Sequence, residues 1–129
     1  MSVAPSIRIA AALIHDDDGR MLLVRKRGTT AFMQPGGKLE PGESAADCLA
    51  RELAEELGIE ADPAEFRHLG RFAAPAANEP GHVVDCDVFE VHYRGAVLAA
   101  AEIEESRWFT RAELAEIELA PLTRENFLN

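Results

Sequence analysis

Residues 37–59 read GKLEPGESAADCLARELAEELGI, and this stretch decides how the rest of the chain is interpreted. Its second half predicts a helix on which Glu52, Glu55 and Glu56 are spaced three and four residues apart or adjacent. Residues three and four apart are neighbours on a helix, and like charges placed there destabilise it by roughly 0.2–0.5 kcal/mol per pair. A divalent cation offsets such repulsion, and carboxylate oxygens suit Mg²⁺, which commonly carries phosphates. The stretch therefore predicts metal-assisted attack on a phosphate chain.

The predicted helix has recognisable ends and one apolar side. Ser44 with Asp47 resembles an N-cap pair, and Gly58 is a residue type that commonly ends helices. At 100° per residue the apolar side chains form one stripe, and the carboxylates crowd along its edge. The stripe consists of Ala46, Leu49, Ala50, Leu53 and Leu57.

Length and composition limit the protein classes that fit. The chain has 129 residues, of which 47% are hydrophobic, and we expect one domain over residues 1–129. A formal charge of −10 disfavours binding to polymeric nucleic acid or to an anionic membrane surface. Small polyanionic substrates still fit, provided that a metal and a few local cations supply positive charge.

Cysteine usage and the first residues bear on the compartment. Two cysteines, Cys48 and Cys86, cannot form a disulfide framework or a metal knuckle, which is typical of a reducing cytoplasm. The N-terminal residues lack the features of a signal peptide, and the sequence has no apolar run long enough to span a membrane. We therefore expect a cytoplasmic protein.

The remaining pattern predicts strands on both sides of the helix. Residues 7–14 read as a buried strand, residues 17–19 as a hairpin turn, and residues 20–27 as the partner strand. Residues 29–42 are expected to form an irregular loop because they contain two Pro-Gly pairs. Further strands are predicted at 66–74, 82–93 and 107–109.

The C-terminal part predicts more helix. Thr110 and Glu113 form a capping box that opens a short helix, and residues 121–129 suit a final helical turn. The order is then strands, helix, strands, helix. This order favours an α+β fold or a three-layer α/β/α sandwich.

At this point the residues resemble the Nudix hydrolase family. Its signature is Gly, five residues, Glu, seven residues, Arg-Glu, an aliphatic, any residue, Glu-Glu, any residue, Gly and an aliphatic. The positions that match are Gly37, Glu43, Arg51, Glu52, Leu53, Glu55, Glu56, Gly58 and Ile59. The resemblance implies an α/β/α sandwich around a mixed sheet, and a hydrolase that acts on a nucleoside diphosphate linked to another moiety with Mg²⁺ or Mn²⁺.

The resemblance also implies roles for individual residues. Glu52, Glu55 and Glu56 would ligate the metal together with the backbone carbonyl of Gly37. Arg51 would pair with the carboxylate six residues after Gly37, Glu43, and brace the loop against the helix.

The base that acts on the attacking water stays open at this stage. Glu52 and Glu56 are candidates within the signature, and a residue from a later loop is the alternative. Three carboxylates before Trp108 could supply it: Glu102, Glu104 and Glu105.

Basic and aromatic residues elsewhere are candidates for contacts with the nucleotide. Arg25, Arg27 and Lys38, with Lys26 between the first two, could bind phosphates, although solvation at a strand end explains each equally well. Core packing is the better explanation for the aromatic residues that could stack on a nucleobase: Phe32, Phe72, Tyr93 and Trp108. Asn78 and Glu79 lie in a Pro-flanked loop that could contact the base or be a simple surface turn.

Among substrates, the short chain favours a compact nucleotide. We expect a nucleoside triphosphate, with oxidised ones included, ahead of ADP-ribose, other nucleoside diphosphate sugars or dinucleoside polyphosphates. A Nudix-fold module that binds a nucleotide without cleaving it is the rival hypothesis, although such a module would be expected to lose carboxylates that are all present here. An acidic Ca²⁺-binding structural protein is a third. Homodimers are common in the family.

Overall fold

The fold is organised around one long central strand. The computed structural model describes residues 5–127. Strand β1 (Ser6–His15) buries Ala10, Ala12 and Ile14 on one face and Ala11 on the other. A strand that is covered on both faces is expected to be apolar almost throughout, which explains the run IAAALI. The other strands are β2 (Met21–Lys26), β3 (Gly36–Lys38), β4 (Arg67–Pro75), β5 (Val83–His92) and β6 (Ile103–Phe109).

The sheet is mixed, with strand order β4-β5-β1-β2-β6 and β3 paired to β1 off this path. β1 runs parallel to β5 over the whole of both strands and antiparallel to β3. The predicted partnership of residues 7–14 with residues 20–27 is wrong for most of their length, because β1 meets β2 only at His15 and Met21. Away from the turn between β1 and β2, β1 pairs with β3, and β2 pairs with β6.

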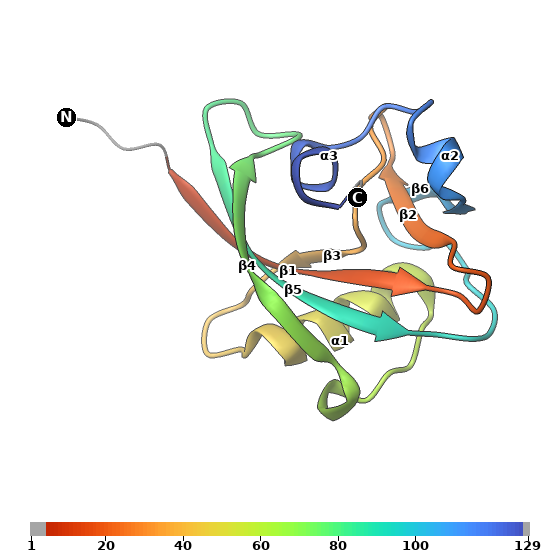
Figure 1. Cartoon of the computed structure of the whole chain (residues 1–129). Helices are drawn as coiled ribbons and strands as arrows, with labels where there is room; N and C mark the ends of the chain where they lie inside the picture. The colour runs from red at the N-terminus through yellow and green to blue at the C-terminus, as the bar shows by residue number, and fades with distance from the viewer. Residues whose placement is uncertain (1–4, 128–129) are drawn as a thin grey trace.

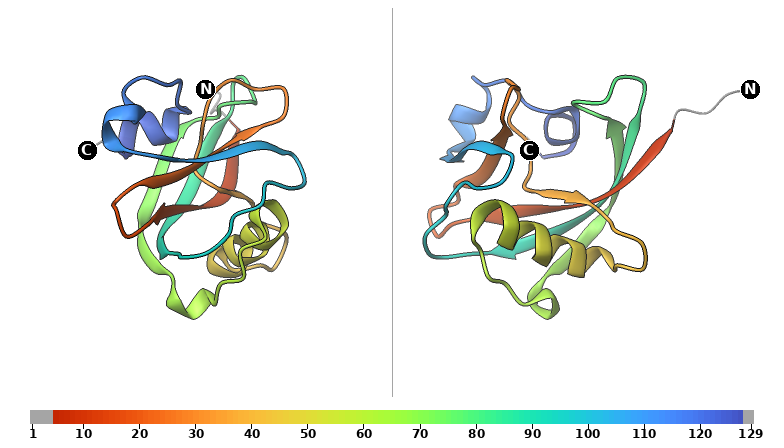
Figure 2. Two further views of the ribbon diagram at one scale, coloured as in Figure 1. Left: turned by 90° about the vertical axis from the view of Figure 1, so that its right-hand side faces the viewer. Right: turned by 180° about the vertical axis from the view of Figure 1, so that it is seen from behind.

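Helices cover both faces of this sheet, which gives the three-layer architecture in Figures 1 and 2. Helix α1 (Ala45–Leu57) packs on one face, where Leu49, Leu53 and Leu57 join the even-numbered residues of β1 in one core cluster. Helices α2 (Arg111–Leu114) and α3 (Pro121–Asn126) lie on the opposite side. The expected fold class is confirmed.

Helix α1 begins and ends where the sequence predicts. The Ser44 side chain accepts a hydrogen bond from the Asp47 backbone N–H at 3.1 Å, and Gly58 adopts the left-handed conformation that commonly ends helices. The capping box of Thr110 and Glu113 also forms. The side of α1 that faces the sheet is the one that carries Leu49, Leu53 and Leu57.

The other predictions hold with small changes at the ends of elements. Strands β4 and β5 match their predicted ranges within one residue, and β6 extends the predicted strand at 107–109 by four residues. The expected loop at 29–42 contains β3, and a short 3₁₀ turn (Pro63–Glu65) precedes β4. The predicted C-terminal turn corresponds to α3, while residues 128 and 129 lie outside the described residues. Within residues 5–127, no helix has the length and apolar character needed to cross a membrane.

Candidate active site

The carboxylates of α1 differ strongly in their exposure to solvent. Glu56 is 2% exposed although it is acidic, whereas the Glu55 side chain is 55% exposed. Glu52 lies between them, with 15% of its side chain exposed. Glu52 and Glu56 therefore lie on the side of α1 that faces the sheet, whereas Glu55 lies near the solvent.

Arg51 connects the loop before α1 to these carboxylates. Its Nε and Nη2 donate to the two carboxylate oxygens of Glu43 at 2.8 and 2.9 Å. Its Nη1 donates to Glu52 at 2.9 Å and to Glu55 at 3.4 Å. The hydrogen bonds from Arg51 lower the pKa of Glu43 to about 2, and the pair raises the pKa of Arg51. Glu43 and Arg51 therefore form a bidentate ion pair, which we call the two-pronged pair.

Gly37 sits where a side chain would collide with the site. A Cβ atom at this position would lie 2.4 Å from the carboxyl carbon of Glu52. The backbone carbonyl of Gly37 accepts a weak hydrogen bond from the buried Cys48 thiol, 3.6 Å away. Burial raises the pKa of that thiol to about 12, so Cys48 is a small neutral residue that leaves room for β3.

Glu56 has an environment that suits a nearby cation. One carboxylate oxygen accepts a long hydrogen bond from the Gly36 N–H at 3.4 Å, and the other is buried without a partner among the described residues. Burial, reinforced by the negative charge of Glu52, raises the pKa of Glu56 to about 8. A buried carboxylate without a partner is costly unless a charge or donor satisfies it. Glu52, Glu56 and the Gly37 carbonyl thus form a donor set of hard oxygens that fits Mg²⁺ or Mn²⁺.

These groups are not arranged as a finished metal centre. Within residues 5–127, no three His, Cys, Asp or Glu side chains converge as metal ligands. Arg51 holds both Glu52 and Glu55 by hydrogen bonds. Each bond engages one carboxylate oxygen, Oε1 of Glu52 and Oε2 of Glu55, so the second oxygen of each is the candidate ligand for a cation.

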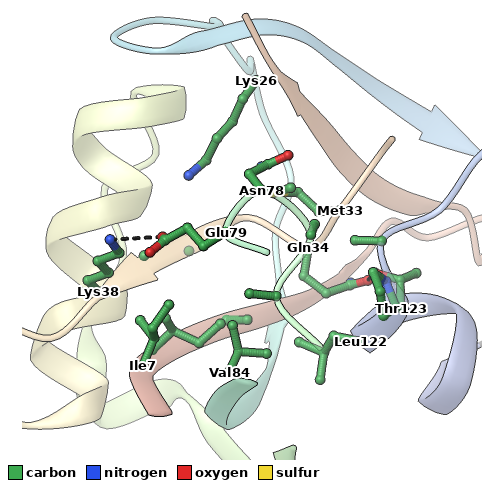
Figure 3. A pocket seen from close by; sticks show the side chains of 18 of the residues that line it. Ile7, Lys26, Met33, Gln34, Lys38, Asn78, Glu79, Val84, Leu122 and Thr123 are labelled. Atoms are coloured by element: carbon green, nitrogen blue, oxygen red, sulfur yellow. Dashed lines mark hydrogen bonds and ion pairs between the residues drawn. The ribbon is translucent and has the colours of Figure 1, made fainter. Parts of the chain in front are cut away.

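A cavity of about 350 Å³ extends from Glu52 to helix α3, and Glu55 and Glu56 are not among its described lining residues. One end, which we call the charged end, is formed by Gly37, Glu52 and Glu102 with two lysines, Lys26 and Lys38. The opposite end, the far wall, is formed by Gln34, Val84, Leu122 and Thr123. Figure 3 shows the lysines and the far-wall residues on different sides of this space. Asn78 and Glu79 of the β4–β5 loop also line it, and Lys38 binds Glu79 at 3.0 Å.

Strand β2 places only one of its basic side chains in the cavity. Lys26 lines it and lies 3.3 Å from Glu102. Arg25 and Arg27, which were expected to bind substrate, are not among the described residues that line it. Arg25 precedes Lys26 on β2, and Arg27 follows the end of the strand. Both pair with β6, as Arg25–Glu105 at 3.2 Å and Arg27–Glu104 at 3.4 Å. Of the three carboxylates before Trp108, the structure therefore brings Glu102 to the site.

The aromatic candidates lie elsewhere. None of the described cavity-lining residues is aromatic. Phe32 packs edge-on against Phe109, and Phe72 packs against Phe127 in the same way. Tyr93 and Trp108 pack against the core cluster beneath α1.

Comparisons with known proteins point to one family. The NUDIX domain family model matches residues 5–128. The chain is 32% identical over 119 residues to the CTP pyrophosphohydrolase of Escherichia coli (strain K12), covering 89% of this chain and 84% of that protein. It is 37% identical over 73 residues to the 8-oxo-dGTP diphosphatase of Haemophilus influenzae, covering 54% of each. The crystal structure of the MutT protein from Methanosarcina mazei Go1 has a TM-score of 0.75 and 25% identity over 99% of this chain and 94% of that one.

Proposed function

Because this chain belongs to the Nudix hydrolases, enzymes that act on pyrophosphate bonds, we propose that it hydrolyses nucleoside triphosphates, oxidised ones included, with Mg²⁺ or Mn²⁺. Nudix hydrolases generally use divalent metal ions. One observation carries the proposal: a single cavity runs from Glu52 of α1 to an uncharged far wall, where the proposal places the nucleobase. The relatives named as CTP pyrophosphohydrolase and 8-oxo-dGTP diphosphatase support a triphosphate substrate.

In this proposal Glu52 and Glu56 hold the cation, with the Gly37 carbonyl as a further ligand and Glu55 joining from the rim. A bound divalent ion supplies positive charge to the phosphate chain and lowers the pKa of water. Glu52, Glu56 or Glu102 accepts the proton of the attacking water. Glu52 and Glu102 line the charged end of the cavity, and Glu56 accepts a hydrogen bond from Gly36, which also lines the cavity. The ion pair between Arg51 and Glu43 holds the preceding loop against α1.

Lys26 and Lys38 bind the phosphates in this scheme. Both line the charged end of the cavity, and each has a flexible side chain that carries a point charge. Their present partners, Glu102 and Glu79, hold them at this end by ion pairs. Water attacks a phosphorus of the triphosphate, and a nucleoside monophosphate and pyrophosphate leave.

A turnover screen tests the proposal. The protein is incubated with Mg²⁺ and a panel that contains CTP, dGTP, 8-oxo-dGTP, ADP-ribose and a dinucleoside polyphosphate. Release of pyrophosphate from at least one triphosphate, abolished by EDTA, is the expected result. Turnover of only ADP-ribose or the dinucleoside polyphosphate would show that the substrate is of that class and not a nucleoside triphosphate. Binding of nucleotides without any hydrolysis would overturn the proposed activity.

A further inference from the structure

We propose that the buried hydrogen bond between Gln34 and Thr123 is a specificity-determining contact. It positions the far wall of the cavity and thereby sets the size of nucleobase that the cavity admits. The inference rests on the proposed function, which places the phosphates at the charged end. Gln34 and Thr123 are therefore positioning residues, because they act through the wall that they hold.

The bond is short and enclosed. The Thr123 hydroxyl donates to the Gln34 amide oxygen at 2.6 Å, and the two residues are 0% and 6% exposed. The Gln34 amide nitrogen donates to the backbone carbonyl of Ala12 at 3.3 Å. A carbonyl can only accept, so this contact assigns the nitrogen of the amide and leaves its oxygen for Thr123. Removing one partner of such a buried pair leaves a polar group unsatisfied.

Helix α3 depends on contacts of this kind for its position. It spans only Pro121–Asn126, its N-cap residue Ala120 makes no side-chain capping bond, and helices this short are not stable alone. The Ala120 backbone N–H donates to the Phe32 carbonyl at 2.8 Å, which ties the start of α3 to the segment before β3. The Gln34–Thr123 bond adds the second tie, one turn further along. Between the two ties lies Leu122, which is 7% exposed and lines the cavity.

The far wall discriminates by shape because its polar groups are already used. The Thr123 hydroxyl and the Gln34 amide bind each other and Ala12, so a ligand meets mainly aliphatic surface from Leu122 and Val84 (Figure 3). Apolar pockets distinguish ligands that differ by one methylene by roughly 10–200-fold, provided that the walls keep their place. Holding Leu122 in position is therefore the property that sets selectivity between small and large bases.

Thr123→Val tests this contact because valine keeps the shape of threonine and removes the hydroxyl. Binding of UMP, GMP and inorganic pyrophosphate is measured by calorimetry in the presence of Mg²⁺, after thermal unfolding has shown that the variant folds. We expect the Kd of at least one nucleotide to rise about tenfold, the ratio of the GMP and UMP values to change, and the Kd of pyrophosphate to stay the same. Thr123→Ser keeps the hydroxyl and should restore both nucleotide values.

Thr30→Val is the matched control. The Thr30 hydroxyl donates to Glu118 at 2.9 Å and ties the same two segments together, but it is exposed and outside the cavity. It should leave all three Kd values unchanged. If Thr123→Val does not fold, Gln34→Met breaks the same bond from the other side and is read in the same way.

The outcomes separate this inference from the proposed function. Unchanged nucleotide binding in the Thr123→Val or Gln34→Met protein, an equal effect of Thr30→Val, or an equal loss of pyrophosphate binding would each overturn the positioning role. Failure of the unsubstituted protein to bind either nucleotide would overturn it too. If the unsubstituted protein hydrolyses nothing, yet Thr123→Val changes the ratio of the GMP and UMP Kd values, the proposed hydrolysis is refuted and the positioning role of Gln34 and Thr123 is supported.

Discussion

Glu56 combines two properties that oppose each other, since it is both ionisable and almost completely buried. Its pKa of about 8 in the folded protein stands against a value of 4.5 for an ordinary glutamate. Between these values the folded protein binds a proton that the unfolded chain has lost. The free energy of unfolding must therefore fall as the pH rises through this window and level off above it. The metal-free protein should lose on the order of 5 kcal/mol in this way.

Replacing Glu56 by glutamine removes the titrating group and keeps the shape. In EDTA, Glu56→Gln should unfold at a higher denaturant concentration than the unsubstituted protein at about pH 9, and at a similar one at about pH 4.5. The same substitution should lower turnover at least a hundredfold, because the proposed cation loses a charged ligand. Urea unfolding across the pH range and a pyrophosphate assay measure the two effects. Parallel pH profiles for both proteins would show that Glu56 is ionised in the folded metal-free state.

A second prediction concerns the lack of room for a side chain at Gly37. An alanine methyl would lie 2.4 Å from the carboxyl carbon of Glu52, so Gly37→Ala must displace that carboxylate. We expect turnover to fall at least about tenfold, with a loss of roughly 1–3 kcal/mol in stability from overpacking. Gly42→Ala is the control: its φ of +79° makes alanine strained, but nothing lies within 4 Å of the added methyl. That variant should lose stability and keep its activity, and equal losses of activity in both proteins would contradict the role of space at Gly37.

At the scale of one element, α1 and its preceding loop are joined by Arg51 and Glu43. Glu43→Gln removes the strongest partner of Arg51 and leaves its guanidinium free to bind Glu52 and Glu55 more fully. The guanidinium then competes with the cation, so the Mg²⁺ concentration for half-maximal turnover should rise about tenfold. A Mg²⁺ titration of the turnover rate measures the shift.

Glu40→Gln is the control for that titration. Glu40 also faces Arg51, but at 3.8 Å and with 65% of its side chain exposed. Exposed pairs of this kind contribute about 0–1 kcal/mol. A Mg²⁺ requirement that moved equally in the two variants would mean that net charge, and not the two-pronged pair, controls the cation site.

The elements also differ in how far the sequence alone predicted them. The ends of α1 were predictable because Ser44 and Gly58 act locally, through bonds within one turn of the helix. Strand β3 was not, because Gly36–Lys38 lacks the β-branched pattern and becomes a strand only by pairing with Ile9, Ala10 and Ala11 of β1. The partner of β2 was predicted wrongly for the same reason, since no local signal selects β6 over β1.

At the scale of the whole molecule, the signature residues were readable from one helix, whereas the cavity was not. Its walls come from β1, the segment before β3, the β4–β5 loop and α3, so Gln34 and Thr123 meet although 89 residues separate them. Lys26 shares the alternation of Leu22 and Val24, which face the core beneath α1. The sequence alone did not select Lys26 over its neighbours, because only the assembled sheet reveals which side of β2 faces the site.

Lys26 therefore carries the prediction that depends on the whole charge distribution. A protein with a net charge of −10 repels a polyphosphate, so the few cations inside the cavity must supply the attraction. Lys26→Met should raise KM at least about tenfold and weaken the dependence of KM on salt, with a smaller change in kcat. Arg25→Met removes the same charge from the adjacent position on β2, where the side chain instead binds Glu105 and the Thr29 carbonyl. Steady-state kinetics at two salt concentrations compare them, and equal changes in KM would show that overall charge, not the position of Lys26, governs substrate binding.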